Sequence, residues 1–251
     1  MSVVSEVWPD DARRDLLIGD WHIYQRSGGH RTSTDDVLTA WHATRDSSRP
    51  RRYLDLGCGI GSVLLMVVHR LRPERSVGVE AQSQSVSMAR RSIAELPEDA
   101  PELRVEESDF RELDFGDERF DLITGSPPYF PLGTGVLPKD PQRLACRFET
   151  RGGVEGYCST ASKVLADDGR LHLVFQTEWD VRVQDAARDV GLHIVDACHF
   201  RMRTDSAQPF LTTYELRRTA RPPRSRTIAV RDARGEYTPE LERLRRELGV
   251  G

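Results

Sequence analysis

The feature that most constrains this chain is a glycine-rich turn between an apolar strand and an apolar helix. Residues 53–56 form a short apolar run, and Gly57, Gly59 and Gly61 follow it at alternate positions before the apolar stretch 63–68. Glycines in a turn adopt positive φ and let a ligand approach the backbone without meeting a Cβ atom. The pattern therefore predicts a buried strand that turns sharply into a helix, with a ligand at the turn.

The spacing of these glycines separates two classes of ligand. Dinucleotide-binding turns carry GxGxxG and place a pyrophosphate on the helix N-terminus. This chain has GxGxG, with Ser62 where the third glycine would fall. The turn therefore favours a ligand that has no pyrophosphate.

Acidic residues follow the next two predicted strands. The strand at 76–79 ends on Glu80, which can accept hydrogen bonds from both hydroxyls of a ribose. The third element ends in Asp109 and Phe110. The carboxylate could accept a hydrogen bond from an adenine amino group, and the aromatic ring could cover the base. Three successive strand ends thus suit one adenosine. The alternative is that both carboxylates lie in solvated loops.

Residues 51–130 resemble the class I methyltransferases. The Rossmann-like sheet of that class carries a D-x-G-x-G-x-G motif, an acidic end of the second strand and an aspartate after the third. The resemblance implies S-adenosylmethionine as the cofactor, which has no pyrophosphate. The cofactor-binding residues that it implies in this part of the chain are Asp55, Gly57, Gly59, Gly61, Glu80, Ala81, Asp109, Phe110 and Ser126.

A second cluster indicates the chemistry. The buried strand predicted at 120–124 leads into Ser126, Pro127, Pro128 and Tyr129 at its carboxyl end, where doubly wound sheets bind their ligands. The tetrapeptide resembles the Asp/Asn/Ser-Pro-Pro-Tyr/Phe motif of amino methyltransferases, and these residues are predicted to be catalytic. The alternative is an ordinary rigid turn, since Pro-Pro pairs are common in loops.

The chemistry explains why such residues are needed. The lone pair of an exocyclic or amide nitrogen is conjugated, so two acceptors that take its hydrogens draw the lone pair toward the methyl group. The Ser126 side chain and the Pro127 carbonyl are the expected acceptors, because proline fixes the backbone direction. Tyr129 offers a face for stacking. No covalent intermediate and no metal are required.

The N-terminal segment narrows the substrate class. Residues 22–42 are similar to the segment that precedes the sheet in the bacterial tRNA(Val) adenine-N6 methyltransferase family, and residues 231–240 are similar to the end of the same family. The matching positions are Gln25, Gly29, Arg31, Asp35, Leu38 and Ala40. The resemblance implies that Arg31 and Asp35 lie near the cofactor. A capped helix start with a surface ion pair is the alternative.

Composition sets further limits. The net charge of −4 is unlike that of a protein that holds a polyanion by bulk charge, although arginines cluster at 49–52 and 217–226. The four cysteines show no CxxC pair, so neither zinc nor a disulfide framework is expected. No apolar stretch is long enough to span a membrane. We expect a cytoplasmic protein, with no membrane partner, no metal and an oligomeric state that the sequence leaves undetermined.

The expected fold is α/β, with a Rossmann-like, seven-stranded, mostly parallel sheet, helices on both faces and an antiparallel edge strand. Residues 1–50 are predicted to be a lead-in and helix covering the cofactor site, 51–220 the methyltransferase core, and 221–251 a basic strand and helix extension. Residues 131–153 combine Pro, Gly and Arg without periodicity. We interpret them as a flap that grips the substrate and orders on binding, with a disordered insertion as the alternative.

Together these features predict an enzyme that transfers a methyl group from S-adenosylmethionine to an exocyclic amino nitrogen, with adenine N6 in tRNA as the first expected target. A glutamine-N5 protein methyltransferase and a DNA amino methyltransferase use the same acceptor pair and stay open. Position 126 is a serine, which occurs more among DNA amino methyltransferases, whereas asparagine is commoner in the RNA adenine and protein glutamine enzymes of this type. A catalytically silent cofactor-binding module is the remaining alternative.

Overall fold

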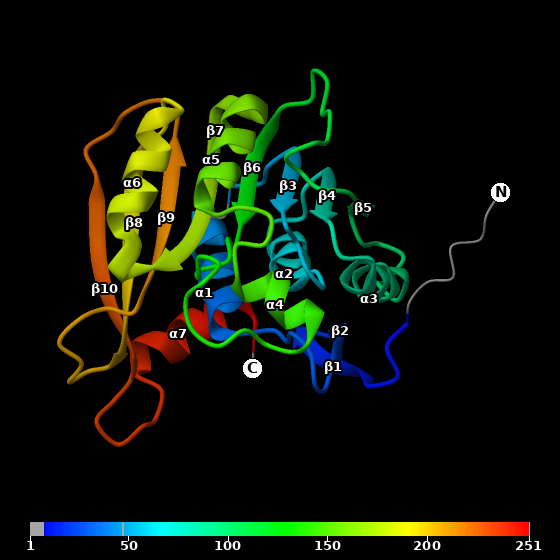
Figure 1. The fold of residues 1–251 in the computed structure, drawn as a ribbon, viewed down its shortest axis with the longest axis horizontal. Coiled ribbons are helices and arrows are strands. Elements are labelled where there is room, and N and C mark those ends of the chain that lie inside the picture. The colour runs from blue at the N-terminus through cyan, green and yellow to red at the C-terminus, as the bar shows by residue number, and fades with distance from the viewer. Residues whose placement is uncertain (1–7, 47, 251) are drawn as a thin grey trace.

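The computed structural model of the chain describes residues 8–46 and 48–250 (Figure 1). Alternating strands and helices make up most of these residues. The helices are α1 (Thr34–Thr44), α2 (Ser62–Leu71), α3 (Ser83–Ala94), α4 (Pro141–Arg147), α5 (Val154–Val164), α6 (Asp180–Asp189) and α7 (Pro239–Leu248), with a short 3₁₀ turn at Thr177–Trp179. The strands are β1 (Ala12–Ile18), β2 (Trp21–Arg26), β3 (Arg52–Leu56), β4 (Arg75–Glu80), β5 (Glu102–Glu107), β6 (Phe120–Gly125), β7 (Leu165–Gln176), β8 (His193–Arg203), β9 (Leu211–Arg217) and β10 (Arg224–Arg231).

The main sheet confirms the predicted fold class. Its strand order is β10-β8-β9-β7-β6-β3-β4-β5, and every neighbouring pair is parallel except the two that involve β9. Two details of the prediction were wrong. The sheet has eight strands rather than seven, because β10 adds to it, and the antiparallel strand β9 lies inside the sheet between β7 and β8.

Helices cover both faces of the sheet, as predicted. One buried cluster joins apolar residues of α1, α2, α3 and α7 to one face, and a second joins α5 and α6 to the other. Figure 1 shows α5 and α6 side by side. Residues 63–68 of α2 are all apolar, so no side of this part of the helix suits solvent. Residues 62–68 are buried accordingly. The strands between the helix layers are therefore held rigidly, and their carboxyl ends form a fixed platform.

The β1–β2 hairpin and α1 both contact the C-terminal helix segment. β1 and β2 form a separate antiparallel hairpin, and the Gly19 amide in its turn donates to the Gly249 carbonyl at 3.1 Å. The indole of Trp41 in α1 donates to Glu247 in α7 at 3.2 Å.

The division into 1–50, 51–220 and 221–251 stays a prediction, and residues 1–7, 47 and 251 lie outside the described residues.

The segment 131–153 contains a helix that the sequence did not predict. Asp140 caps α4 by accepting from the Arg143 amide at 2.9 Å, and Pro141 occupies the first turn. Gln142 of α4 donates to Ser85 of α3 at 3.0 Å. This segment is therefore attached to the rest of the fold at several points, and its ordering on substrate binding stays a prediction.

Candidate active site

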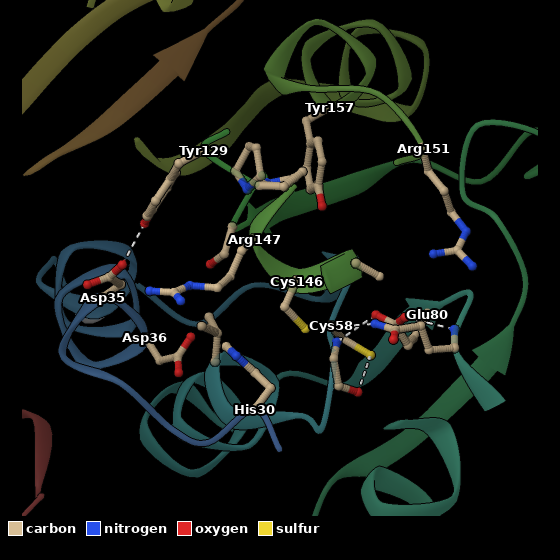
Figure 2. A pocket seen from close by; sticks show the side chains of 18 of the residues that line it. His30, Asp35, Asp36, Cys58, Glu80, Tyr129, Cys146, Arg147, Arg151 and Tyr157 are labelled. Atoms are coloured by element: carbon tan, nitrogen blue, oxygen red, sulfur yellow. Dashed lines mark hydrogen bonds between the residues drawn. The ribbon is translucent and has the colours of Figure 1, made fainter. Parts of the chain in front are cut away.

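A cavity of about 470 Å³ opens at the carboxyl ends of the central strands (Figure 2). Its walls come from the glycine turn after β3, the ends of β4, β5 and β6, the first turn of α1, and the segment that holds α4. Thirteen predicted site residues line it: Arg31, Asp35, Asp55, Gly57, Gly59, Glu80, Ala81, Asp109, Phe110, Ser126, Pro127, Pro128 and Tyr129. Gly61 is the one predicted residue that does not.

The glycine turn adopts the backbone that its sequence predicts. Gly57, Gly59 and Gly61 have φ values of 63°, 56° and 89°, in the left-handed region that favours glycine. A Cβ atom built on Gly59 would meet nothing within 4 Å, so this residue faces open space in the cavity. Gly61 instead forms the N-cap of α2. The turn therefore presents bare backbone to whatever enters the cavity.

Glu80 connects the end of β4 to this turn. One carboxylate oxygen accepts from the Gly59 amide at 2.9 Å and the other from the Gln82 amide at 2.8 Å. Burial raises the pKa of this carboxyl, and the two backbone hydrogen bonds oppose that rise. Each oxygen still has a second lone pair available. Glu80 is thus both fixed in place and able to accept further hydrogen bonds.

Asp109 and Phe110 lie beyond β5 on the same wall. The guanidinium and the amide of Arg111 donate to the Asp109 carboxylate, and the Arg111 side chain holds the Asp109 pKa below its usual value. The ring of Phe110 meets the edge of Tyr157 with centroids 4.6 Å apart. The assignment of Asp109 to an adenine amino group stays a prediction, because Arg111 already engages both of its carboxylate oxygens.

The wall formed by β3 and α1 is acidic. Asp55 accepts from Thr124 at 2.6 Å, and Asp36 closes a capping box with Ser33 at the start of α1. Burial raises the pKa of both carboxyls to about 7, and it raises the pKa of Asp35 as well. Carboxyl groups with displaced pKa values that gather in one cavity are typical of functional sites. The arrangement favours a positively charged ligand.

The turn after β6 faces this wall. The Ser126 hydroxyl is buried and has no hydrogen-bond partner among the described residues. The Tyr129 hydroxyl donates to Asp35 at 2.7 Å, and its ring meets Phe175 edge-on with centroids 5.6 Å apart. Figure 2 shows this bond across the cavity. The hydroxyl of residue 126 is thus left free where a polar group could bind it, and residue 129 is held from two sides.

Tyr157 of α5 is a cavity residue that the sequence analysis missed. A Cβ atom on Gly57 would lie 2.5 Å from its hydroxyl, and one on Gly125 would lie 2.6 Å from its ring. Both glycines are therefore needed to admit this side chain. In the sequence, Tyr157 belongs to an amphipathic helix and looks like an ordinary core residue. In the sequence, the glycine directly before Ser126 is the signal that a large side chain packs against this turn.

Other lining residues were also missed, for different reasons. His30 precedes α1, Asp36 lies in the first turn of α1, and Cys146, Arg147 and Arg151 lie in or just after α4. Figure 2 shows these side chains directed toward the opening. His30 has a lowered pKa, chiefly because it is buried. None of these residues belongs to a motif that marks it in the sequence.

Away from the cavity, one buried group has the geometry to hold a metal ion. Ligand atoms of His42, Asp196 and Glu215 lie within 4.8 Å of one another. Arg45 is paired with Asp196, and Arg217 with Glu215 at 2.5 Å. These guanidinium groups already neutralise the carboxylates. The prediction that no metal takes part stays a prediction.

Within residues 8–46 and 48–250, no helix has the length and apolarity to cross a bilayer.

Comparison with known proteins agrees with this geometry. A family model described as "Methyltransferase domain" matches residues 54–131. The tRNA1(Val) (adenine(37)-N6)-methyltransferase of Porphyromonas gingivalis is 29% identical over an alignment of 230 residues that covers 85% of this chain and 86% of that protein. The protein of the same name from Yersinia pestis is 26% identical over 218 residues, with 85% of each chain covered.

Solved structures show the same fold. A predicted O-methyltransferase from Agrobacterium tumefaciens superimposes with a TM-score of 0.62 at 20% identity, covering 86% of this chain and 97% of the other. A ribosomal protein L11 methylase from Lactobacillus delbrueckii gives 0.53 at 13% identity, covering 78% and 84%. The chain therefore carries a methyltransferase domain, and over most of its length it is similar to the bacterial tRNA1(Val) adenine-N6 methyltransferases.

Proposed function

We propose that this enzyme transfers the methyl group of S-adenosylmethionine to the exocyclic N6 amino group of an adenine in tRNA. The observation that supports this most is the free, buried hydroxyl of Ser126, on the wall of the cavity that also holds the glycine turn and Glu80. A buried hydroxyl without a partner is costly unless a ligand satisfies it. An amino group that enters the cavity would do so.

The residues of the cavity fit the cofactor. Glu80 keeps free lone pairs on both oxygens for the ribose hydroxyls, and the open space above Gly59 leaves room for the ligand against bare backbone. Phe110 would cover the base. When bound, the cofactor supplies an electrophilic methyl group on a positively charged sulfur. The acidic wall of Asp35, Asp36 and Asp55 would stabilise that positive charge.

The residues after β6 would bind the acceptor. The Ser126 hydroxyl and the Pro127 carbonyl would accept the two hydrogens of the amine, which turns its lone pair toward the methyl group. Tyr129 would stack on the base, and its hydrogen bond to Asp35 would keep the ring from rotating away. Positioning and local polarity then lower the barrier without a covalent intermediate.

The substrate class rests on the names of the relatives, which act on adenine 37 of tRNA1(Val). Bases in an RNA loop are unpaired, so one can enter a cavity without the full cost of extrusion from a duplex. A cytoplasmic location would suit such a substrate. Glutamine-N5 and DNA amino transfer remain as outcomes that the experiment must distinguish.

The experiment is to incubate the enzyme with labelled S-adenosylmethionine and unmodified tRNA, and then to identify the modified nucleoside by mass spectrometry. We expect N6-methyladenosine, and label that ribonuclease removes from the macromolecular fraction. Label that persists after nuclease treatment and is found on glutamine would overturn the proposal. So would label confined to DNA, or cofactor binding without turnover on RNA, DNA or protein.

A further inference from the structure

Arg147 at the end of α4 differs from the other arginines that anchor this part of the cavity. Arg143 donates to the Gly29 carbonyl at 3.1 Å, and Arg26 pairs with Asp140 at 2.7 Å. The guanidinium of Arg147 makes no hydrogen bond and no ion pair with any residue that the structure describes. Arginines with partners hold the segment in place, and Arg147 is left available.

The backbone of Arg147 is nevertheless fixed to the turn that carries the acceptor residues. Its carbonyl accepts from the Phe130 amide at 3.0 Å, and the Phe130 carbonyl accepts from the Glu149 amide at 2.9 Å. Glu149 is in turn paired with Arg182 of α6 at 2.5 Å. The position of Arg147 relative to Tyr129 is therefore set by main-chain hydrogen bonds, although its side chain is exposed.

The Arg147 side chain lies at the end of the cavity where the acceptor is proposed to bind, and away from the end proposed for the adenosine. Figure 2 shows the Arg147 guanidinium on the side where Asp35 and Tyr129 lie. Arg151, on the same segment, lies on the other side near Glu80. Arg151 lowers the pKa of Glu80 through its charge, and Arg147 acts in the same way on His30. The charges of Arg151 and Arg147 thus act at different ends of the cavity.

Electrostatics makes such a cation necessary for an RNA substrate. The chain has a net charge of −4, and the cavity wall holds Asp35, Asp36, Asp55 and Glu80. An RNA phosphate that approached this wall would meet repulsion unless a positive group lay between them. A planar guanidinium donates two parallel hydrogen bonds to a phosphate. Arg147 is the residue in place to do so.

We propose that Arg147 binds a backbone phosphate of the RNA next to the nucleotide that is methylated. This inference rests on the proposed function. It adds the residue that fixes the RNA strand at the mouth of the cavity, so that the target base reaches Ser126 and Tyr129. The carboxylate of the cofactor is another anionic group that Arg147 could bind. The experiment must therefore distinguish binding of the RNA phosphate from binding of this carboxylate.

The experiment measures tRNA affinity in the presence of S-adenosylhomocysteine at salt concentrations from about 50 to 200 mM. In Arg147→Ala we expect affinity at low salt to fall by about tenfold or more. The slope of log affinity against log salt should become shallower by about 0.7 to 0.9, the loss of one phosphate contact. Arg147→Lys should keep the slope while binding more weakly, because lysine retains the charge but not the fork.

Arg188→Ala is the matched control. Arg188 lies at the end of α6 and is paired with Asp185 one turn before it, and α6 runs back from the carboxyl edge of the sheet. The same change in charge there should alter neither affinity nor slope. Thermal unfolding of each variant confirms that the fold is retained.

Two results would overturn the inference. One is an unchanged slope and affinity in Arg147→Ala, and the other is a loss of cofactor affinity with RNA binding intact, which would assign Arg147 to the cofactor carboxylate. Either result would leave the proposed function standing, provided that the wild-type enzyme methylates adenine in tRNA. Failure of the wild type to methylate RNA would overturn the proposed function itself.

Discussion

The hydroxyl of Tyr129 donates a hydrogen bond of 2.7 Å to Asp35, which joins the turn after β6 to the first turn of α1. Burial raises the pKa of the tyrosine well above its usual value and also raises that of the aspartate. The N-terminal segment therefore forms part of the same cavity as the turn after β6. Asp35 holds the ring that is proposed to stack on the target base.

The first prediction concerns this bond. Tyr129→Phe keeps the ring but loses the hydrogen bond, so we expect the single-turnover rate to fall by about tenfold, the usual effect of a hydrogen bond to a charged group. Tyr129→Ala, which also loses the stacking surface, should reduce the rate further. Tyr129→Phe should slow the Asp35→Ala variant by much less than tenfold, since the hydrogen bond is already lost in that variant. Additive effects would show that the two residues act separately.

The second prediction separates chemistry from binding. Ser126→Ala removes one of the two proposed acceptors, and loss of one such group typically lowers kcat by about 10² to 10³-fold. Cofactor affinity, measured by calorimetry, should stay the same. Stability should not fall, because the hydroxyl has no partner in the protein. Ser126→Asn, which supplies a carbonyl acceptor, should retain activity. Full activity in Ser126→Ala would remove the serine from the mechanism.

The third prediction tests the link between β4 and the glycine turn. Glutamine at position 80 can accept only one of the two backbone hydrogen bonds from Gly59 and Gln82. We expect Glu80→Gln to weaken cofactor binding by at least about tenfold and to destabilise the fold by about 1–3 kcal/mol. Glu107→Gln is the control, because Glu107 ends the neighbouring strand outside the cavity. Equal cofactor affinities in the two variants would contradict the assignment of Glu80.

The fourth prediction concerns pH. Asp36 and Asp55 have pKa values of about 7, raised chiefly by burial, so each is largely neutral at pH 6 and largely ionised at pH 8. Affinity for the positively charged cofactor should therefore rise by about tenfold over this range, in proportion to the ionised fraction of one carboxylate. S-adenosylhomocysteine, which lacks the sulfonium charge, is the control ligand and should show a smaller rise. Asp36→Asn combined with Asp55→Asn should flatten the profile, and an equal rise for both ligands would contradict the prediction.

The fifth prediction concerns stability rather than activity. His172 in β7 is buried, its two ring nitrogens have no partner among the described residues, and its ring meets that of His42 at 4.9 Å. Burial, followed by the charges of His42 and nearby arginines, lowers its pKa well below the usual value. Only the unfolded state then takes up a proton near pH 6.5, so the stability present above that pH is lost as the pH falls.

We therefore expect the wild type to lose about 1.4 kcal/mol more than His172→Gln between pH 7.5 and pH 5.5, as measured by denaturant unfolding. Comparing the two proteins removes contributions from the other titrating groups. His22→Gln is a useful control, because His22 lies in the separate β1–β2 hairpin. The same pH dependence in His172→Gln and the wild type would show that folding does not lower the pKa of His172.

The sequence predicted the parts of the fold that carry strong local signals. The turn at Gly57 and Gly59, the acidic end of β4 and the turn at Ser126 all lie on one cavity, because parallel strands bring their carboxyl ends to the same edge. Each signal depends on residues next to each other in the chain. The position of β9 within the sheet depends on long-range pairing, which alternation alone does not specify.

Three other features could not be predicted from local patterns, for different reasons. The helix α4 is short and lies in a segment rich in proline and glycine, where Asp140 and Pro141 were its only start signal. Arg111 engages Asp109 from two residues away, and a sequence cannot show whether a carboxylate faces its neighbour or a ligand. Tyr157 reached the cavity through the packing of α5, a tertiary contact.

The ring of Tyr157 has a consequence for how such an enzyme could change its specificity. It touches Gly57 on the cofactor side and Gly125 on the acceptor side, so it acts as a spacer between the donor and the acceptor of the methyl group. A substitution at position 157 would alter the gap between the two reactants without changing any residue proposed to bind either of them. The distance across which the methyl group moves would thus be set by a residue of α5 rather than by the strand ends.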